Sequence, residues 1–355
     1  MAEKILMKGN EAIGEAAVVA GCRHYFGYPI TPQSELIEYM ARRMPQVEGV
    51  FLQAESEIAA INMVYGASGA GARVMTSSSS PGISLKQEGI SYIAGAELPC
   101  VIVNIVRGGP GLGSIQPGQC DYFQATKGGG HGDYHNIVLA PNSVQELVDM
   151  TILAFDLADK YRNPVMLLGD GALGQMMEPV EFKKSTSKPP AKPWATTGLR
   201  GRSETNVINS LHIQPDALEK HNIHLQQKYS TITANETRYE AQYTEDAELV
   251  LVAYGITSRI AQSAMERARK EGMKVGMIRP ITVWPFPVKP FIETAPKAKA
   301  FLALELSAGQ MVEDVRLAVN GVRPVYHFGR TGGMIPSPKD IYAQITKILQ
   351  GKEGN

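Results

Sequence analysis

Short apolar runs alternate along residues 1–180 with longer stretches whose apolar positions recur at helical spacing. The runs typical of strands are His24–Tyr28, Arg73–Ser77, Cys100–Val106 and Pro164–Leu168. The stretches typical of helices are Gln33–Arg43, Glu55–Ser68, Ile83–Ala94 and Ser143–Tyr161. Strands that are separated by crossover helices favour βαβ units, so the pattern predicts a parallel sheet with helices on both faces.

The pattern changes after residue 180. Glu181–Arg202 is locally basic and contains three prolines, which is typical of a linker. Pro215–Tyr243 then has the pattern of one polar helix, and we expect it to connect two regions rather than to lie in a core. The residues that fall roughly on one face of it are Leu218, Leu225, Tyr229 and Ile232.

Alternation of strands and helices resumes near Glu248, which predicts a second, smaller α/β domain. Its expected strands are Leu249–Ala253, Lys274–Ile278, Ala300–Leu304 and Val325–Phe328, and its expected helices are Ser258–Glu271 and Gln310–Asn320. The predicted organisation is therefore a first domain over residues 1–182, a linker with a connector helix over 183–245, and a second domain over 246–355.

Charge and cysteine content narrow the classes of partner. The 355 residues hold 35 Lys and Arg against 35 Asp and Glu, which gives no bulk electrostatic reason to expect nucleic acid or a membrane as partner. No apolar run approaches the ~20 residues that span a bilayer, and charges interrupt the first twenty residues, so no signal peptide is expected.

The three scattered cysteines, Cys22, Cys100 and Cys120, fit a reducing cytoplasm. Because a cubane iron–sulfur cluster normally takes four cysteines, any such cluster must lie on another chain.

Two stretches could carry chemistry, and the first of them lies at the end of an expected strand. Gly27-Tyr28-Pro29-Ile30-Thr31-Pro32 precedes an expected helix, where Thr31 would offer a hydroxyl and an N–H to an anion. The simpler alternative is that the prolines shape a turn and Thr31 caps the helix.

In the second stretch, Gln53-Ala54-Glu55-Ser56-Glu57, two carboxylates open a helix, which the ordinary preference for acids at helix starts could explain. The functional alternative is that Glu57 points into an apolar pocket and shares a proton with a ligand nitrogen.

These motifs occur in order with a third, Thr76-Ser77-Ser78-Ser79-Ser80-Pro81-Gly82, and with Arg107 in Val106-Arg107-Gly108-Gly109-Pro110. With the second α/β region, the chain resembles over nearly its whole length the alpha-type subunits of 2-oxoacid:ferredoxin oxidoreductases. Within that family it looks closest to the branched-chain type, which acts on 2-oxoisovalerate (3-methyl-2-oxobutanoate), and the 2-oxoglutarate type is also near.

The resemblance implies a fold and a set of roles. The first domain would bind the pyrimidine half of thiamine diphosphate, and the second would be of the transketolase C-terminal type. Glu57 matches the glutamate that bonds N1′ of the aminopyrimidine ring and would be the catalytic residue. Thr31 and Arg107 would bind the substrate carboxylate. Tyr28, Pro29, Ser79 and Ser80 would lie beside the cofactor, and Glu55 is interpreted as an ordinary charge at a helix start.

No metal ligand is expected on this chain. Gly169-Asp170-Gly171 resembles the start of a Mg²⁺-diphosphate motif, but no Asn follows at the required distance, which favours a structural turn. His131, Asp133 and His135 lie close in sequence, yet without a fourth ligand a metal site is the weaker interpretation. The family implies a beta-type subunit that holds the diphosphate and Mg²⁺, gamma and ferredoxin-like subunits that complete the complex with at least one iron–sulfur cluster, and ferredoxin as electron acceptor.

The predicted activity is oxidative decarboxylation of a branched-chain 2-oxoacid to acyl-coenzyme A, in the cytoplasm and only with the partner subunits. Gly329-Arg330-Thr331-Gly332-Gly333 could approach an anion, such as part of coenzyme A. One alternative is the same role with 2-oxoglutarate, which an extra cation in the site would favour. Another is a non-catalytic scaffold or regulatory subunit, which the presence of Glu57 and Arg107 disfavours. A self-sufficient thiamine enzyme is opposed by the missing Mg²⁺ motif and by the cysteine count.

Overall fold

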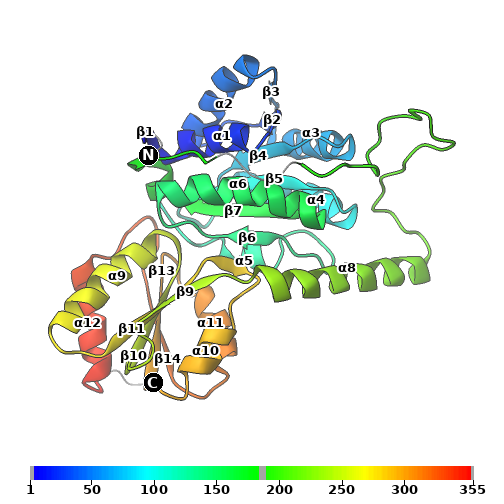
Figure 1. Cartoon of the computed structure of the whole chain (residues 1–355). Helices are drawn as coiled ribbons and strands as arrows, with labels where there is room; N and C mark the ends of the chain where they lie inside the picture. Colours follow the sequence, from blue (N-terminus) through cyan, green and yellow to red (C-terminus); the bar gives the residue numbers. More distant parts are fainter. Residues whose placement is uncertain (1–3, 184–188, 353–355) are drawn as a thin grey trace.

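The computed structural model describes residues 4–183 and 189–352, which form two sheets flanked by helices (Figure 1). The larger sheet has seven strands in the order β12-β6-β7-β5-β4-β2-β3, and its pairs are parallel except for β12 with β6. Its strands are β2 (His24–Gly27), β3 (Val50–Gln53), β4 (Val74–Ser78), β5 (Cys100–Val106), β6 (Ile137–Leu139), β7 (Pro164–Asp170) and β12 (Thr282–Trp284). The predicted α/β class with a parallel sheet is thus confirmed.

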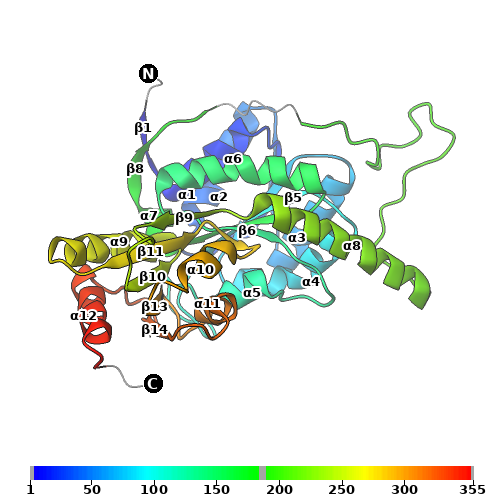
Figure 2. The same ribbon diagram turned by 60° about the horizontal axis from the view of Figure 1, so that its bottom comes forward.

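The central strands β4, β5 and β7 are buried along their whole length because helices cover both faces of this sheet. Figure 2 shows α1, α2 and α6 on one side of the sheet and α3 and α4 on the other. The helices of this region are α1 (Gly9–Val19), α2 (Ser34–Gln46), α3 (Glu57–Gly69), α4 (Pro81–Gly95), α5 (Tyr122–Thr126), α6 (Val144–Tyr161) and α7 (Gly171–Gln175). A short antiparallel pair, β1 (Ile5–Lys8) with β8 (Met177–Val180), lies beside them.

The smaller sheet has five strands in the order β14-β13-β10-β11-β9. Its strands are β9 (Tyr239–Gln242), β10 (Leu249–Ala253), β11 (Val275–Pro280), β13 (Ala300–Glu305) and β14 (Val325–Gly329). Figure 1 shows α9 (Gly255–Lys270) and α12 (Pro338–Leu349) on one face, and α10 (Lys289–Thr294) and α11 (Met311–Val319) on the other. One apolar core runs from the larger sheet into the α10 and α11 face, so the two sheets are packed against each other.

The connector between the sheets differs from the prediction. The expected helix Pro215–Tyr243 is wrong at its end, because α8 spans Pro215–Glu236 and the chain then enters strand β9. Strand β9 pairs antiparallel with the edge strand β11, and Glu240 forms an ion pair with the buried Arg279 at 3.0 Å. Pairing at that edge satisfies the backbone, so tertiary structure overrides the helical pattern. Residues 189–214 precede α8 as an irregular arm that extends from the body (Figure 1), and residues 184–188 of the expected linker lie outside the described residues.

Among the helices that the structure describes, none has an apolar stretch of the length needed to cross a membrane.

Candidate active site

The expected site residues follow neighbouring parallel strands of the larger sheet. Residues 28–32 follow β2, Glu57 comes shortly after β3, Ser79 follows β4 and Arg107 follows β5. These strands are paired β3-β2-β4-β5 in parallel register, so their carboxyl ends meet at one edge of the sheet. That edge is where open parallel sheets bind ligands.

Glu57 is the first residue of α3 and is only 6% exposed. Ser56 caps the helix by accepting a hydrogen bond from the Ala59 N–H at 3.1 Å, which leaves Glu57 at the positive end of the helix dipole. Within the described residues, no side chain or backbone group donates a hydrogen bond to the Glu57 carboxylate. A Cβ placed on Gly82 would lie 2.6 Å from Glu57 Oε1, so glycine is needed for the carboxylate to reach this position. Glu55, by contrast, is exposed.

The serine run places small polar groups beside Glu57. Ser78, Ser79 and Ser80 are buried, and the Ser78 and Ser79 hydroxyls have no hydrogen-bond partner among the described residues. Ser80 has a φ of 29° and its N–H donates to Asn104 Oδ1 at 3.1 Å, which holds a strained turn at the start of α4. Unpaired buried hydroxyls are costly in a closed core, so this surface is suited to a polar ligand.

The Arg107 guanidinium lies across the end of the sheet. Its Nη1 donates to the Thr31 carbonyl at 3.0 Å and its Nη2 donates to the Leu112 carbonyl at 2.9 Å, while Nε is buried with no partner among the described residues. Thr31 and Arg107, both expected to bind the substrate carboxylate, are therefore in direct contact, and their binding role stays a prediction. The alternative role of Thr31 as a helix cap is wrong, because α2 begins at Ser34 and its N-cap is Gln33.

The other two residues of the same turn are less enclosed. Tyr28 is half-buried and its carbonyl accepts a hydrogen bond from Gln33 Nε2 at 3.4 Å, whereas Pro29 is exposed. Both lie at the edge that Glu57 and Arg107 share.

A cavity of about 630 Å³ opens beside Arg107, between the two sheets. Pro81, Pro110 and Asp121 line it from the larger sheet, and Leu306 and Ala308 line it from the smaller one. Among the described residues that line it, Arg107 is the only cation and Asp121 the only acid. Asp121 accepts a hydrogen bond from Asn104 Nδ2 at 2.9 Å, and burial raises the pKa of its carboxyl despite that bond.

Sequence reasoning missed Asp121 and the smaller-sheet wall of this cavity. Asp121 carries no motif, because it is placed by a long loop after β5. Leu306 and Ala308 are about two hundred residues away from Arg107 in sequence. Thr331 and Gly332 also line the cavity, and they belong to the glycine-rich run that the sequence indicated as an approach for an anion.

A buried glutamine, also missed, joins the two sheets next to the cavity. Gln119 Nε2 donates to the Tyr254 carbonyl at 2.9 Å. Gln119 Oε1 accepts from Thr257 Oγ1 and from the Leu306 N–H, both at 2.9 Å. Two residues further, Asp121 is in the cavity wall, so Gln119 fixes that wall against the smaller sheet.

Asp170 and His135, from the two stretches that could resemble metal sites, make structural contacts instead. Asp170 Oδ1 caps α7 by accepting from the Ala172 and Leu173 N–H groups at 2.8 and 3.2 Å. The His135 ring stacks on Trp284 with 4.5 Å between ring centroids. Among the described residues, no group of three or more His, Cys, Asp or Glu side chains is placed to hold a metal ion.

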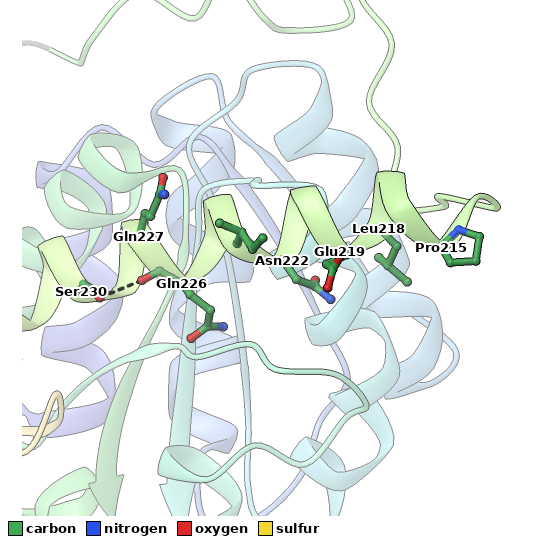
Figure 3. Close-up of a pocket in the computed structure, with 8 residues that line it drawn as sticks. Pro215, Leu218, Glu219, Asn222, Gln226, Gln227 and Ser230 are labelled. Atoms are coloured by element: carbon green, nitrogen blue, oxygen red, sulfur yellow. Dashed lines mark hydrogen bonds between the residues drawn. The ribbon is translucent and has the colours of Figure 1, made fainter.

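A second hollow, of about 570 Å³, runs along the outer face of α8 (Figure 3). Leu218, Asn222 and Gln226 line it, and Ser230 Oγ donates to the Gln226 carbonyl at 3.0 Å. None of the expected site residues lies there, and the hollow is open to one side. The chemistry therefore concentrates at the edge of the larger sheet.

Known proteins are similar to this chain along most of its length. The family model described as pyruvate flavodoxin/ferredoxin oxidoreductase, thiamine diphosphate-binding, matches residues 15–245, and the model described as pyruvate:ferredoxin oxidoreductase core domain II matches residues 247–341. The chain is 54% identical over 344 residues to ketoisovalerate oxidoreductase subunit VorB of Methanothermobacter marburgensis, covering 97% of each chain.

More distant relatives have related names. The chain is 36% identical over 376 residues to 2-oxoglutarate synthase subunit KorA of Methanothermobacter thermautotrophicus, covering 98% of this chain and 100% of that one. A solved structure of 2-oxoglutarate:ferredoxin oxidoreductase from Magnetococcus marinus, with 2-oxoglutarate, coenzyme A and succinyl-CoA bound, matches with a TM-score of 0.86 and 28% identity. The match covers 98% of this chain and 66% of that longer chain.

Proposed function

This chain belongs to the thiamine-diphosphate-binding family of pyruvate flavodoxin/ferredoxin oxidoreductases, and we propose that it is the alpha-type subunit of a branched-chain 2-oxoacid:ferredoxin oxidoreductase. The proposed reaction is the oxidative decarboxylation of 2-oxoisovalerate to an acyl-coenzyme A, with electrons passed to ferredoxin. Two observations support it. The first is the 54% identity to a ketoisovalerate oxidoreductase subunit, and the second is the set of residues that line the cavity beside Arg107.

The residues at the sheet edge fit the aminopyrimidine half of thiamine diphosphate. Glu57 offers an unpaired carboxylate in a nearly enclosed place, and the Ser78 and Ser79 hydroxyls are unpaired beside it. When bound, thiamine diphosphate supplies a carbon nucleophile and accepts the electrons that decarboxylation releases. In the proposed role, Glu57 shares a proton with ring atom N1′, and the closely packed turn at Ser79 and Ser80 keeps water from that contact. Tyr28 and Pro29 flank the same site.

Arg107 is the proposed carboxylate-binding residue. Its guanidinium is already oriented by the carbonyls of Thr31 and Leu112, so little side-chain entropy is lost when it binds an anion. In this role Thr31 acts by holding Arg107 through its carbonyl.

The choice of substrate rests on one observation: the described residues that line the cavity include a single cation, Arg107. A 2-oxoisovalerate molecule has one carboxylate, which Arg107 would bind, and an isopropyl group, which Pro81, Pro110 and Leu306 would contact. The second carboxylate of 2-oxoglutarate would meet Asp121 and no second cation among the described residues that line the cavity. The 2-oxoglutarate alternative, motivated by the relatives of that name, is therefore less favoured.

The remaining parts of the reaction require partners. The three cysteines are unpaired and far apart in sequence, and Cys22 and Cys100 are buried, so this chain does not offer a four-cysteine cluster site. We assign the diphosphate, the Mg²⁺ and the iron–sulfur clusters to beta-type, gamma and ferredoxin-like subunits, and the site of action to the cytoplasm. Thr331 and Gly332, at the mouth of the cavity, are the proposed approach for coenzyme A.

The test is anaerobic turnover by this chain co-expressed with its partner subunits. With thiamine diphosphate, Mg²⁺ and coenzyme A present, we expect reduction of a viologen dye to be fastest with 2-oxoisovalerate among 2-oxoisovalerate, 2-oxoglutarate and pyruvate. No turnover from a complex with verified clusters and cofactor would support the scaffold alternative instead. Faster turnover of 2-oxoglutarate would refute the substrate choice alone.

A designed variant sharpens the choice of substrate. Ala308 lines the cavity and is exposed, so Ala308→Arg adds a second cation without disturbing the core. We expect this variant to turn over 2-oxoglutarate relatively better than the natural chain does, while Ala308→Leu, which adds bulk without charge, should not. An equal effect of both substitutions would mean that size rather than charge governs the change.

A further inference from the structure

Lys86 is a fully buried lysine, 0% exposed, in the middle of α4. Its Nζ donates one hydrogen bond, to Thr76 Oγ1 of β4 at 2.6 Å, and no carboxylate lies within ion-pair distance of it among the described residues. Burial lowers the pKa of Lys86 from its ordinary value to about 7. A methionine or leucine would fill the same space without the cost of burying an amine, so packing alone does not account for lysine here.

The position of Lys86 is defined by the packing of α4 on α3. Gly82, Lys86 and Gly89 are spaced by four and three residues and so share one face of α4. A Cβ on Gly82 would lie 2.6 Å from Glu57 Oε1, and a Cβ on Gly89 would lie 2.5 Å from Ile61 Cγ2, so that face packs directly on α3. Lys86 is therefore one helical turn along α4 from the contact with the Glu57 carboxylate.

The charged and titratable groups that face Lys86 are few. From α3 comes Glu57, whose negative charge favours the protonated form of Lys86. From β5 comes Cys100, and burial raises the pKa of its thiol to about 12, so it is neutral at physiological pH. From β4 comes the neutral Thr76 hydroxyl. Among the described residues, Glu57 is thus the only charged neighbour, so the charge of Glu57 affects the protonation of Lys86.

This coupling matters because Glu57, in the function proposed above, gains a shared proton when the cofactor ring binds. That proton neutralises the attraction that keeps Lys86 charged in a buried place. We propose that Lys86 is a positioning residue that acts through Glu57, and that it releases its own proton when Glu57 and N1′ of the bound cofactor ring come to share one. The protons balance: one is gained between Glu57 and N1′, one is lost from Lys86 Nζ, and the net charge of the buried site is unchanged.

The proposal makes cofactor binding depend on pH in a defined way. Where Lys86 is protonated, binding takes no net proton from the solvent at this site, because Lys86 supplies the balance. Where Lys86 is already neutral, binding takes up about one proton from the solvent. The change between the two regimes lies near pH 7, where Lys86 titrates in the folded protein.

The experiment is calorimetric titration of the assembled complex with thiamine diphosphate and Mg²⁺, in buffers of different ionisation enthalpy, from pH 6 to pH 8.5. The comparison is with Lys86→Met, which keeps the size of the side chain but cannot titrate. Relative to that variant, we expect the natural complex to take up about one more proton per bound cofactor at the top of this pH range than at the bottom. Protons bound or released by the diphosphate are the same in both complexes and cancel in the comparison. Identical uptake curves for the two complexes would overturn the proposal.

A second variant covers the case in which Lys86→Met does not assemble. Glu57→Gln cannot change its charge on binding, so the step near pH 7 should disappear from its uptake curve. A step that persists in Glu57→Gln would show that Lys86 does not act through Glu57. Turnover of 2-oxoisovalerate by the natural complex tests the proposed function separately, so an active complex without the proton step would refute this inference alone.

Discussion

The chemistry of the site depends at the residue scale on two side chains with opposite surroundings. Glu57 has a nearly enclosed carboxylate without a hydrogen bond among the described residues, whereas the Arg107 guanidinium is held by two backbone carbonyls. An unpaired buried acid is available for proton sharing, and a preorganised cation is available for anion binding. Each arrangement leads to a separate prediction.

Replacing the Glu57 carboxyl by an amide should abolish most of the activity while the complex still assembles. Glu57→Gln keeps the shape of the side chain but cannot exchange a proton with N1′, so turnover should fall by at least ~100-fold, the low end for a positioned acid–base group. Glu55→Gln is the matched control, because Glu55 is exposed two residues earlier and should leave turnover near normal. Steady-state rates at saturating cofactor check both, and equal loss in the two variants would contradict the assignment.

Arg107→Lys tests whether the shape of the guanidinium matters as well as its charge. A lysine ammonium cannot reach the Thr31 and Leu112 carbonyls and a substrate carboxylate together, so KM for 2-oxoisovalerate should rise on the order of 10- to 100-fold, with a smaller change in kcat. Initial rates over a range of substrate concentration measure the two constants separately. Unchanged KM for every 2-oxoacid would remove Arg107 from the substrate site.

Motifs in the sequence indicated Glu57, Arg107 and the serine run, because each lies at or shortly after the end of a strand and so keeps a short, recognisable context. Asp121 and Lys86 could not be found in this way. Asp121 reaches the cavity through a long loop, and Lys86 has the local pattern of an ordinary exposed helical lysine. Only the packing of α4 on α3 and β4 shows that Lys86 is buried.

At the scale of elements, the close approach of α3 and α4 places Glu57. Glycines at the contact make the approach possible, because a side chain at Gly82 or Gly89 would overlap α3. The sequence predicted both helices within two residues of their observed bounds, and it predicted the central strands equally well. It did not predict their contact, since the spacing of small residues within one helix does not identify the partner helix.

Gly82→Ala should therefore damage the site without breaking the helix. The added Cβ would lie 2.6 Å from Glu57 Oε1 and 2.0 Å from Ser78 Oγ, so the carboxylate must move. We expect turnover to fall on the order of 100-fold, as for a displacement of about 1 Å of a reacting group. Gly66→Ala on α3 is the control, since no atom lies within 4 Å of its new Cβ, and it should stabilise the fold by about 0.5–1 kcal/mol. Urea unfolding and turnover of both variants separate the two effects.

At the scale of the whole molecule, the site belongs to both sheets. Strand β12 comes from the chain after residue 246 and completes the larger sheet, and Leu306 with Thr331 closes the cavity opposite Arg107. The sequence predicted neither β12 nor β6 as a strand, and their pairing depends on contacts between residues more than 140 positions apart. The proposed boundaries at residues 182 and 245 divide the chain by pattern, and they separate β12 from the sheet that it joins.

Replacing Gln119 should test the contact between the two sheets. Truncation to alanine would leave the Tyr254 carbonyl, the Thr257 hydroxyl and the Leu306 N–H without their buried partner. Unpaired buried groups cost about 1–3 kcal/mol each, so Gln119→Ala should lower the free energy of unfolding by at least about 1 kcal/mol. Because Leu306 and Asp121 both line the cavity, KM for 2-oxoisovalerate should rise as well.

A structural defect alone would change stability but not substrate affinity. Measuring both the urea midpoint and KM of Gln119→Ala therefore shows whether Gln119 also positions the substrate. Gln226→Ala is the control, since Gln226 is exposed on α8 and donates to the Asp133 carbonyl outside the cavity. It should change neither the urea midpoint nor KM. If Gln119→Ala lowers the urea midpoint while KM stays constant, the cavity wall keeps its geometry without the glutamine. The junction would then hold the sheets together without positioning the substrate.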